Sequence, residues 1–267
     1  MIGRAVQSRV DLQRQLATLG VERGTILVVH TSFKAIGPID GGPRGLIDAL
    51  LDALGPEGTL VMPAMADSDD DAFDLAVTPC RTMGIVADTF WRLPGVLRSD
   101  SPHSFAAIGP RAAEIAAPHP PDLPHGPDSP IGRVHDLDGS VLLLGVGHDA
   151  NTTVHLAEYL AEVPYRIPKF CVVRREGVPV RVEYAEIDHC CRNFRLVGEW
   201  LAARGLERRG PVGHGTARLA RAREIVTTVV PELRSDPYRF LCRQGTCDEC
   251  DLAWASVPKS SNPKSSN

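Results

Sequence analysis

Residues 141–158 carry the feature that most constrains this chain, because a short apolar run leads directly into a glycine-rich turn and then into a segment with helical character. Residues 141–144, Val-Leu-Leu-Leu, predict a buried strand. Gly145 and Gly147 allow the backbone to turn sharply at the end of that strand. An Asn-Thr-Thr sequence at 151–153 then offers a cap for a helix. The predicted corner gathers histidine, hydroxyls and free backbone amides on one small surface, and ligands of open α/β sheets bind at such corners.

Strand-like and helix-like segments alternate through the first half of the chain. Predicted strands lie at 25–29, 59–62, 105–108 and 141–144, and predicted helices at 9–19, 43–54, 84–92, 111–117 and from about 152. The first helix has a Ser-x-x-Asp capping pattern and ends at Gly20, and Gly55 ends the second. This alternation predicts an α/β protein with a layered α/β/α central sheet.

The later part of the chain has a different pattern. Two β-rich runs at 170–173 and 180–184 flank a Glu-Gly turn and predict a β-hairpin. Two helices are predicted after it, at about 191–204 and 216–230. The hairpin and the cysteine-rich C-terminus suggest a smaller subdomain attached to the central sheet.

Length and composition bound the organisation and the class of partner. The 267 residues suit a single domain over 1–257, with the smaller subdomain within 165–255. The repeated Pro-Lys-Ser-Ser-Asn of 258–267 predicts a disordered tail or a cloning remnant. A net charge of −4 argues against nucleic acid as the main partner and suits a cationic ligand. We expect no membrane association, because no apolar run approaches the ~18–20 residues of a membrane span and no signal peptide is evident.

Cysteine usage and charge also suggest where the protein works. The seven cysteines are an odd number and most lie late in the chain, which suits a reducing cytoplasm better than a disulfide framework. We therefore expect a cytoplasmic protein. A monomer and a homodimer are both compatible with the sequence.

His155 is the first candidate for chemistry, because it lies in the first turn of the helix that follows the glycine-rich corner. The helix dipole disfavours a positive imidazole there, which keeps the ring neutral and basic, as a general base requires. A capping or packing role is the alternative. Either Glu186 or Asp188, after the predicted hairpin, or Glu183 on it, is expected to orient His155 or receive a cationic amine; plain surface carboxylates remain the alternative.

Two other polar groups follow predicted strands. His30, Thr31, Ser32 and Phe33 end the first strand, where the hydroxyls either donate to a ligand carbonyl or satisfy the backbone. Acidic residues crowd the loop after the second strand: Asp67, Asp69, Asp70, Asp71 and Asp74. Like charges this close repel one another, so a cationic ligand would stabilise them, although a solvated loop is the ordinary explanation.

Late cysteines raise the question of a metal. His189-Cys190-Cys191 and Cys247-Asp248-Glu249-Cys250 together supply enough ligands for a tetrahedral zinc site, in which four protein ligands leave no open position. Such a zinc ion would be structural and would tie the C-terminus to the hairpin. The alternative is buried cysteines and an exposed Cys-x-x-Cys pair.

Longer strings of residues resemble a known family. They are Val28-Val29-His30-Thr31-Ser32-Phe33, Gly58-Thr59-Leu60-Val61-Met62-Pro63, Ala87-Asp88-Thr89-Phe90-Trp91-Arg92-Leu93-Pro94, Leu143-Leu144-Gly145-Val146-Gly147-His148-Asp149-Ala150-Asn151-Thr152-Thr153, Asp188-His189-Cys190-Cys191 and Cys247-Asp248-Glu249-Cys250. On these strings the chain resembles the aminoglycoside 3-N-acetyltransferases over about 12–252, and among them the class IV type associated with apramycin and gentamicin. Two positions depart from the usual pattern, since Ser101 and then His103 flank a proline that a histidine usually precedes, and Met65 stands where the class IV type has tryptophan.

The resemblance implies an antibiotic-resistance enzyme and a fold outside the common N-acetyltransferase superfamily. It implies acetyl-CoA as donor, the 3-amino group of a 2-deoxystreptamine ring as acceptor, and His155 as the base, helped by an acidic residue near the hairpin. On this reading acetyl-CoA lies against residues 30–33 together with Gly147, Thr152 and Thr153. Carboxylates hold the drug: Asp67, Asp69, Asp70, Glu183 and Glu186.

Two other functions stay open on the residues. A zinc-dependent hydrolase using His155 and Glu158 as ligands is one, although His-x-x-Glu alone is a weak signal and H-E-x-x-H is absent. A non-catalytic module that binds a drug or CoA is the other.

Overall fold

The computed structural model describes residues 4–258 and contains a seven-stranded sheet in the order β3-β4-β2-β1-β5-β9-β8. The strands of this sheet are β1 (Ile26–Thr31), β2 (Thr59–Pro63), β3 (Leu97–Arg98), β4 (Phe105–Ile108), β5 (Ser140–Leu144), β8 (Arg208–Val212) and β9 (Gly215–Arg221). The central strands β2, β1 and β5 are parallel, whereas β4 and β9 join them in antiparallel register. The carboxyl ends of three central strands therefore meet at one edge of the sheet.

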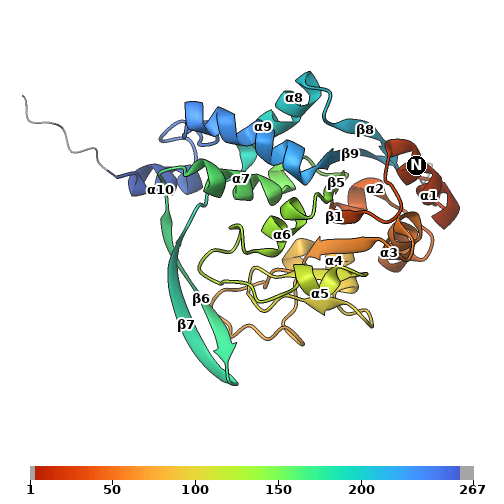
Figure 1. The fold of residues 1–267 in the computed structure, drawn as a ribbon, viewed down its shortest axis with the longest axis horizontal. Coiled ribbons are helices and arrows are strands. Elements are labelled where there is room, and N and C mark those ends of the chain that lie inside the picture. The colour runs from red at the N-terminus through yellow and green to blue at the C-terminus, as the bar shows by residue number, and fades with distance from the viewer. Residues whose placement is uncertain (1–3, 259–267) are drawn as a thin grey trace, which may run out of the picture.

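Helices cover both faces of this sheet (Figure 1). One face is covered by α1 (Arg9–Leu19), α2 (Phe33–Ile36), α3 (Gly42–Leu54) and α4 (Ile85–Phe90), and the other by α5 (Ala112–Ile115), α6 (Pro130–Asp136), α7 (Thr153–Ala161), α8 (Arg195–Ala203) and α9 (Ala222–Ser235). The strand period of two explains the layers: Leu142 and Leu144 face the first set of helices, whereas Val141 and Leu143 face the second. The predicted layered α/β/α fold is confirmed.

Local signals account for several element boundaries. The Ser8 hydroxyl accepts a hydrogen bond from the Asp11 N–H at the start of α1, and Gly20 ends that helix with φ of 104°. Left-handed backbone of this kind favours glycine. Gly55, with φ of 69°, likewise follows the end of α3.

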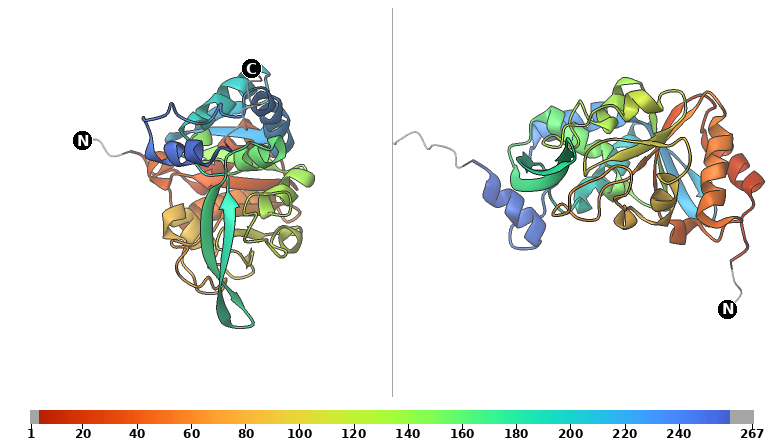
Figure 2. Two further views of the ribbon diagram at one scale, coloured as in Figure 1. Left: turned by 90° about the vertical axis from the view of Figure 1, so that its left-hand side faces the viewer. Right: turned by 90° about the horizontal axis from the view of Figure 1, so that it is seen from below.

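A separate two-stranded sheet stands apart from the layers. It consists of β6 (Ile167–Arg175) and β7 (Val178–Glu186), and its tip protrudes beyond the rest of the fold (Figures 1 and 2). The last helix, α10 (Asp248–Ser256), contacts β6 near the base of this hairpin. Three short 3-10 helices complete the fold: η1 (Arg81–Met83), η2 (His148–Ala150) and η3 (Arg192–Phe194).

The segment between the hairpin and α10 corrects one prediction. The sequence predicts one helix over 216–230, but Gly215–Arg221 is strand β9, and α9 begins only at Ala222. The backbone of Gly213 has φ of 59° at the turn between β8 and β9, which suits glycine. Since β8 and β9 return to the main sheet, we propose that the smaller subdomain consists of two separated segments within 165–255. Of the predicted tail 258–267, all but Pro258 lies outside the described residues.

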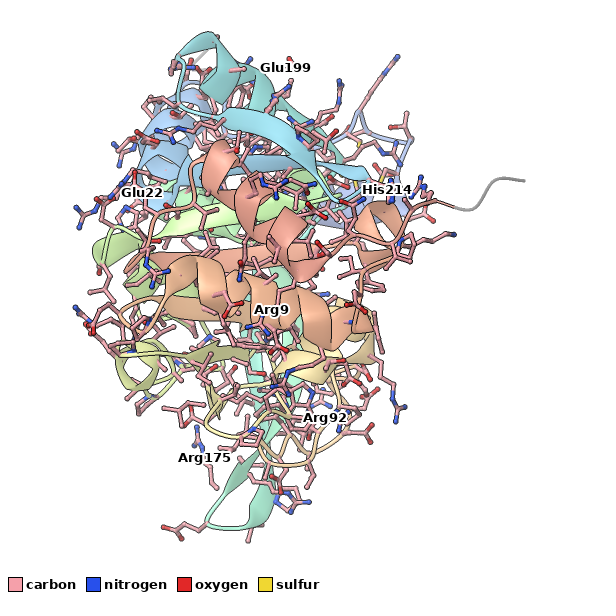
Figure 3. All side chains as sticks on the ribbon, turned by 90° about the vertical axis from the view of Figure 1, so that its right-hand side faces the viewer. Arg9, Glu22, Arg92, Arg175, Glu199 and His214 are labelled. Carbon is pink, nitrogen blue, oxygen red and sulfur yellow. The ribbon has the colours of Figure 1, made fainter. Side chains whose placement is uncertain are left out.

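Charged side chains lie on the surface around these layers. Arg9, Glu22, Arg92, Arg175 and Glu199 are all exposed and point outward (Figure 3). Among the described residues, no helix combines the length and the apolar character that crossing a membrane requires.

Candidate active site

A cavity of about 360 Å³ opens at the edge where the central parallel strands end. Its lining comes from the ends of β1 and β2, from the glycine-rich corner, and from three distant loops. The lining residues are His30, Thr31, Pro63, Met65, Thr82, Met83, His125, Val146, Asp149, Ala150, Asn151, Thr152, His155 and Phe194. The cavity therefore lies where the sequence predicted a ligand site.

His155 lies in the first turn of α7, as predicted, and its ring is held by a carboxylate of the same helix. Its Nδ1 lies 2.7 Å from Oε2 of Glu158, whose side chain is completely buried. Because a carboxylate only accepts, Nδ1 carries the proton and Nε2 keeps its lone pair. The partner of His155 is thus Glu158 rather than Glu183, Glu186 or Asp188. The i, i+3 spacing of the His-x-x-Glu string is the signal that could have identified it.

The other oxygen of Glu158 receives two further hydrogen bonds. Tyr165 Oη and His189 Nε2 each lie 2.8 Å from Oε1. Burial by itself raises the pKa of Glu158, but the charge of His189 and the hydrogen bonds from both histidines outweigh burial and bring the pKa to about 2. Glu158 is therefore an anion throughout the physiological range.

Cys191 lies on the far side of the His155 ring. Its Sγ is 3.6 Å from Nε2 of His155 and 3.3 Å from the carbonyl oxygen of His189. The backbone N–H of Cys191 also donates to Nδ1 of His189 at 3.1 Å. His189 and Cys191 therefore contact the His155–Glu158 pair.

The corner before α7 is fixed by a second buried carboxylate. Glu207 Oε2 lies 2.7 Å from Nε2 of His148, and Asn151 Nδ2 lies 3.1 Å from the other ring nitrogen. Asn151 Oδ1 then accepts a hydrogen bond from the Thr153 N–H at the start of α7. Thr152 precedes the helix, but its side chain makes no capping bond. Asn151 is thus the residue that caps α7.

Several predicted donor-site groups meet the cavity with free polar atoms. His30 Nε2 and Thr31 Oγ1 are buried and have no hydrogen-bond partner within the described structure. Burial, with His148 as a second cause, lowers the pKa of His30 to about 4, so its ring is neutral at pH 7. Thr152 also lines the cavity, whereas Ser32, Phe33, Gly147 and Thr153 do not. Gly147 lines a neighbouring pocket instead.

A cluster of histidines surrounds Glu186, next to the His155 ring. The Nε2 atoms of His103 and His125 each lie 4.0 Å from Oε1 of Glu186. The ring of His125 stacks on that of His155 with centroids 5.3 Å apart. Burial, followed by the charge of Asp188, raises the pKa of Glu186 to about 8. His125 was not predicted, and only the distant loops that carry His103 and His125 bring them here.

The remaining predicted acidic residues are mostly engaged elsewhere. Asp188 pairs with Lys169 at 2.6 Å, and Asp67 accepts hydrogen bonds from the backbone and hydroxyl of Thr82. Glu183 is exposed on β7 beside Arg181. Burial raises the pKa of Asp69, whose neighbours are Lys169, Asp70 and Asp188. None of these carboxylates is among the residues that line the cavity.

Four thiols gather between the base of the hairpin and the C-terminal segment. The Sγ atoms of Cys190, Cys242, Cys247 and Cys250 all lie within 4.8 Å of one another. This set corrects the predicted one, because His189 and Cys191 face the His155–Glu158 pair and Cys242 completes the group. Cys242 stands alone in the sequence, without a local spacing to mark it.

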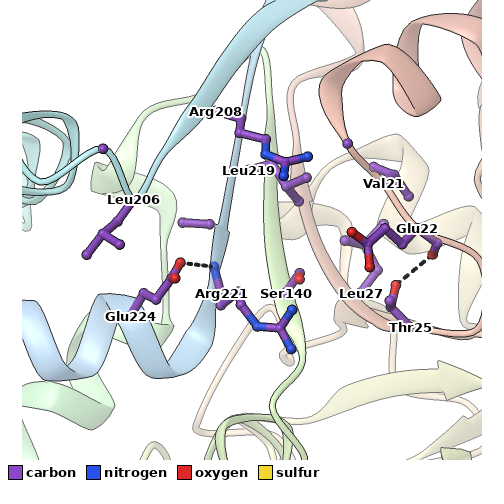
Figure 4. A pocket seen from close by; sticks show the side chains of 13 residues that line it. Val21, Glu22, Thr25, Leu27, Ser140, Leu206, Arg208, Leu219, Arg221 and Glu224 are labelled. Atoms are coloured by element: carbon purple, nitrogen blue, oxygen red, sulfur yellow. Dashed lines mark hydrogen bonds between the residues drawn. The ribbon is translucent and has the colours of Figure 1, made fainter.

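A smaller cavity of about 190 Å³ lies at the opposite end of β1 and β5 (Figure 4). Leu27, Ser140 and Leu219 line it together with Arg221 and Glu224, which bond to each other through the Arg221 N–H. It contains neither a histidine nor a thiol. The chemistry-bearing side chains are therefore concentrated in the larger cavity.

Comparison with known proteins gives consistent findings. Residues 28–234 match the model of the family described as aminoglycoside 3-N-acetyltransferase. The chain is 53% identical over 234 residues to aminoglycoside N(3)-acetyltransferase IV of Salmonella sp, covering 87% of this chain and 90% of that relative. A crystal structure of the aminoglycoside acetyltransferase AAC(3)-IVa apoenzyme is 50% identical, covers 96% of this chain and 100% of its own, and has a TM-score of 0.93.

Solved complexes are also similar to this chain. Structures of AAC(3)-IVa with one histidine changed to alanine, at 50% identity, contain a gentamicin (TM-score 0.91, 96% of this chain and 100% of that chain) and apramycin (0.87, 93% and 100%). AAC-IIIb with CoASH is 27% identical, with a TM-score of 0.79 and coverage of 86% of this chain and 97% of its own.

Proposed function

The chain belongs to the aminoglycoside 3-N-acetyltransferase family and is an acetyltransferase that modifies aminoglycosides at the 3-amino group, and from this premise we propose how its residues perform the transfer. His155 is the general base, Glu158 orients it, and acetyl-CoA is the donor. The observation that carries this assignment is the buried 2.7 Å contact between His155 Nδ1 and Glu158 Oε2, which leaves Nε2 as the basic atom. His155 also lines the cavity, so Nε2 is placed to receive the proton of an acceptor amine.

The transfer itself is direct in this proposal. The 3-amino nitrogen attacks the thioester carbonyl carbon, the N–C bond forms, and the C–S bond breaks to release CoA as a thiol. The amine proton passes to Nε2 of His155 and is then available to the departing sulfur. Glu158 stabilises the imidazolium that forms, and holding both substrates in one cavity supplies much of the advantage by proximity.

The donor side of the cavity is the edge formed by β1 and the corner before α7. Thr31 Oγ1 and His30 Nε2 are buried without partners in the described structure, so each has a hydrogen-bonding position free for a ligand. We assign the thioester end of acetyl-CoA to these atoms and to Thr152. Donors placed there would stabilise the negative charge that develops on the carbonyl oxygen.

The acceptor side is the cluster around Glu186. A cationic amine beside this carboxyl would lower its raised pKa and convert it to an anion, which is how a buried acid receives a cation. The neutral rings of His103 and His125 leave Nδ1 atoms free to bond the hydroxyls of a sugar. Apramycin and gentamicin are the acceptors that we propose, because a similar enzyme was solved with each of them.

The test is acetyl-CoA-dependent release of thiol in the presence of apramycin, gentamicin or neomycin. We expect release with apramycin and gentamicin, and a loss of about 10²–10⁴-fold in kcat for His155→Ala, the range for a general base. His214→Ala, which removes an exposed histidine distant from the cavity, is the matched control. Full turnover by His155→Ala would remove His155 from the mechanism, and absence of thiol release with every drug would overturn the proposed acceptors.

We also propose that Cys190, Cys242, Cys247 and Cys250 hold a structural zinc ion. Four thiols within 4.8 Å of one another match the ligand number and type of closed tetrahedral zinc sites. With four protein ligands, no position is left for substrate, so the ion would stabilise the fold rather than act in the reaction. The zinc hydrolase alternative loses support, because His155 and Glu158 are hydrogen-bonded to each other instead of sharing an open metal position.

A cytoplasmic location follows from the same proposal. Acetyl-CoA is made inside cells, and all seven cysteines are free thiols in the structure. Fractionation of cells that express the protein tests this location. The oligomeric state stays a prediction, of either a monomer or a homodimer.

A further inference from the structure

We propose that the four-thiol site positions the catalytic pair, and that three consecutive residues, His189, Cys190 and Cys191, transmit this effect. The inference rests on the proposed zinc site and on the proposed roles of His155 and Glu158. It goes beyond them, because a closed structural metal site would ordinarily affect stability alone.

The side chains of these three residues point in alternating directions. Cys190 Sγ lies 3.6 Å from the Sγ atoms of both Cys242 and Cys250. Its neighbours face the opposite way: His189 Nε2 lies 2.8 Å from Glu158 Oε1, and Cys191 Sγ lies 3.6 Å from His155 Nε2. One residue of the turn therefore belongs to the thiol cluster, and both flanking residues contact the catalytic pair.

The turn that joins the two sites is tight and strained. Cys191 has φ of 54°, a left-handed conformation that a residue with a side chain adopts only when its surroundings hold it there. The Cys191 N–H donates to His189 Nδ1 at 3.1 Å, which fixes the proton of His189 on Nε2 and directs it at Glu158. Fixing Cys190 to a metal would hold this turn in the conformation that orients His189.

A second contact joins the same two regions. Cys242 follows Phe240 closely in the sequence, and the Phe240 ring packs on His189 with centroids 6.4 Å apart. Asn193 Nδ2 donates to the carbonyl oxygens of Phe240 and Leu241 at 3.3 and 3.4 Å. The segment that carries Cys242 is therefore packed against the side of His189 that the thiol cluster does not reach directly.

Loss of the metal should consequently weaken catalysis before it weakens drug binding. Without an ordered turn, Glu158 Oε1 loses the His189 donor and keeps only Tyr165, and the His155 ring loses part of its support. Since a hydrogen bond to a charged group is lost from the reacting state, kcat should fall about 10- to 100-fold. KM for the drug should change much less, because Glu186 does not contact the turn through any hydrogen bond described.

The experiment compares Cys247→Ser with Cys171→Ser. Cys247 belongs to the thiol cluster but contacts neither His155 nor His189, and Cys171 is a buried thiol of β6 outside the cluster. Zinc content is measured by atomic absorption, kcat and KM by thiol release, and the Nδ1 proton of His155 by its downfield NMR resonance. We expect Cys247→Ser to lose zinc, the resonance and about 10- to 100-fold in kcat, and Cys171→Ser to retain all three.

The failures of the two proposals are distinguishable. Wild-type protein that is fully active and contains no zinc would overturn the zinc site and this inference together. Stoichiometric zinc in the wild type, with unchanged kcat and resonance after its loss in Cys247→Ser, would overturn only the coupling.

A second pair of variants decides the matter if Cys247→Ser does not fold. His189→Ala and His189→Gln leave all four thiols in place, so both should bind zinc fully. A glutamine amide can still donate to Glu158, and it should restore part of the kcat and the resonance that alanine loses. Wild-type kcat and an unchanged resonance in His189→Ala would overturn the positioning role.

Discussion

His155 and Glu158 lie one helical turn apart on α7, with Nδ1 of the ring 2.7 Å from Oε2 of the buried carboxylate. Residues three apart on a helix lie on the same face, so the base and its orienting acid come from one local segment. The fold adds what the helix cannot supply, namely burial and the two further donors on Oε1, Tyr165 and His189.

The first prediction concerns the charge of Glu158. Glu158→Gln keeps the size of the side chain but removes the acceptor charge that three donors share, and its amide group must face at least one of them. We expect kcat to fall about 10- to 100-fold with little change in KM for the drug, as expected for losing about 1.5–3 kcal/mol from a charge-assisted hydrogen bond in the reacting state. Steady-state kinetics measure this split.

Glu162→Gln is the matched control for Glu158→Gln. Glu162 ends the same helix, lies nearer the surface, and makes no side-chain hydrogen bond in the described structure. Equal effects of the two substitutions on kcat would contradict the special role of Glu158.

The second prediction is that drug binding releases a proton from Glu186. With a pKa of about 8, Glu186 is largely protonated at pH 7 in the free enzyme, and an adjacent ammonium group would lower that pKa. Calorimetric titrations in buffers of different ionisation enthalpy should detect proton release on drug binding at pH 7. Glu186→Gln should bind more weakly and without this release, whereas release of unchanged size would place the proton elsewhere.

The third prediction is the effect of Glu186 on stability as pH changes. A carboxyl whose pKa rises from 4.5 to about 8 on folding stabilises the folded state fully below pH 4.5, and this contribution is lost as pH rises through 8. Between these limits the Tm of the wild type should fall with rising pH relative to that of Glu186→Gln. Parallel Tm curves for the two proteins would show that the folded-state pKa is close to the ordinary value.

Local patterns sufficed for much of the fold and for the centre of the site. The strand at 140–144, the turn after it and the position of His155 in the first turn of α7 all follow from neighbouring residues, which is why they could be predicted. The strand period of two and the caps at Ser8 and Gly20 are local in the same sense. The prediction for segment 215–221 was wrong because its pairing with β5 is a tertiary interaction that overrides local helical patterning.

The parts of the site that the sequence did not reveal are the ones built over long distances. His125 and His103 reach Glu186 from separate loops, and Cys242 joins the thiol cluster without a spacing motif. Glu158 was within reach of sequence reasoning, but His-x-x-Glu is too short a string to decide between a metal pair and an oriented base. Burial and the proximity of other donors decide that question, and both are properties of the fold.

The fourth prediction separates function from stability at Thr31. Its hydroxyl is buried without a partner in the described structure, so Thr31→Val removes an unsatisfied polar group while nearly preserving shape. We expect unfolding free energy to be unchanged or higher in urea titrations, and kcat/KM for acetyl-CoA to fall about tenfold, as for the loss of one hydrogen bond. Thr228→Val, at a buried threonine of α9, is the control that should leave kcat/KM unchanged. An unchanged kcat/KM in Thr31→Val would exclude Thr31 from the donor site.

The last prediction concerns Glu207, which supports the corner before α7. Its completely buried carboxylate accepts from His148 at 2.7 Å and from Arg218 at 3.1 Å, and it also contacts Arg209. Glu207→Gln leaves two arginines without their buried counter-charge, and breaking such an ion pair costs about 3–5 kcal/mol of unfolding free energy. A looser His148 would also release Asn151, which caps α7 and lines the cavity, so KM for acetyl-CoA should rise together with the loss of stability. Urea unfolding and steady-state kinetics test both effects, and a destabilised variant with unchanged KM would show that the corner keeps its shape without this carboxylate.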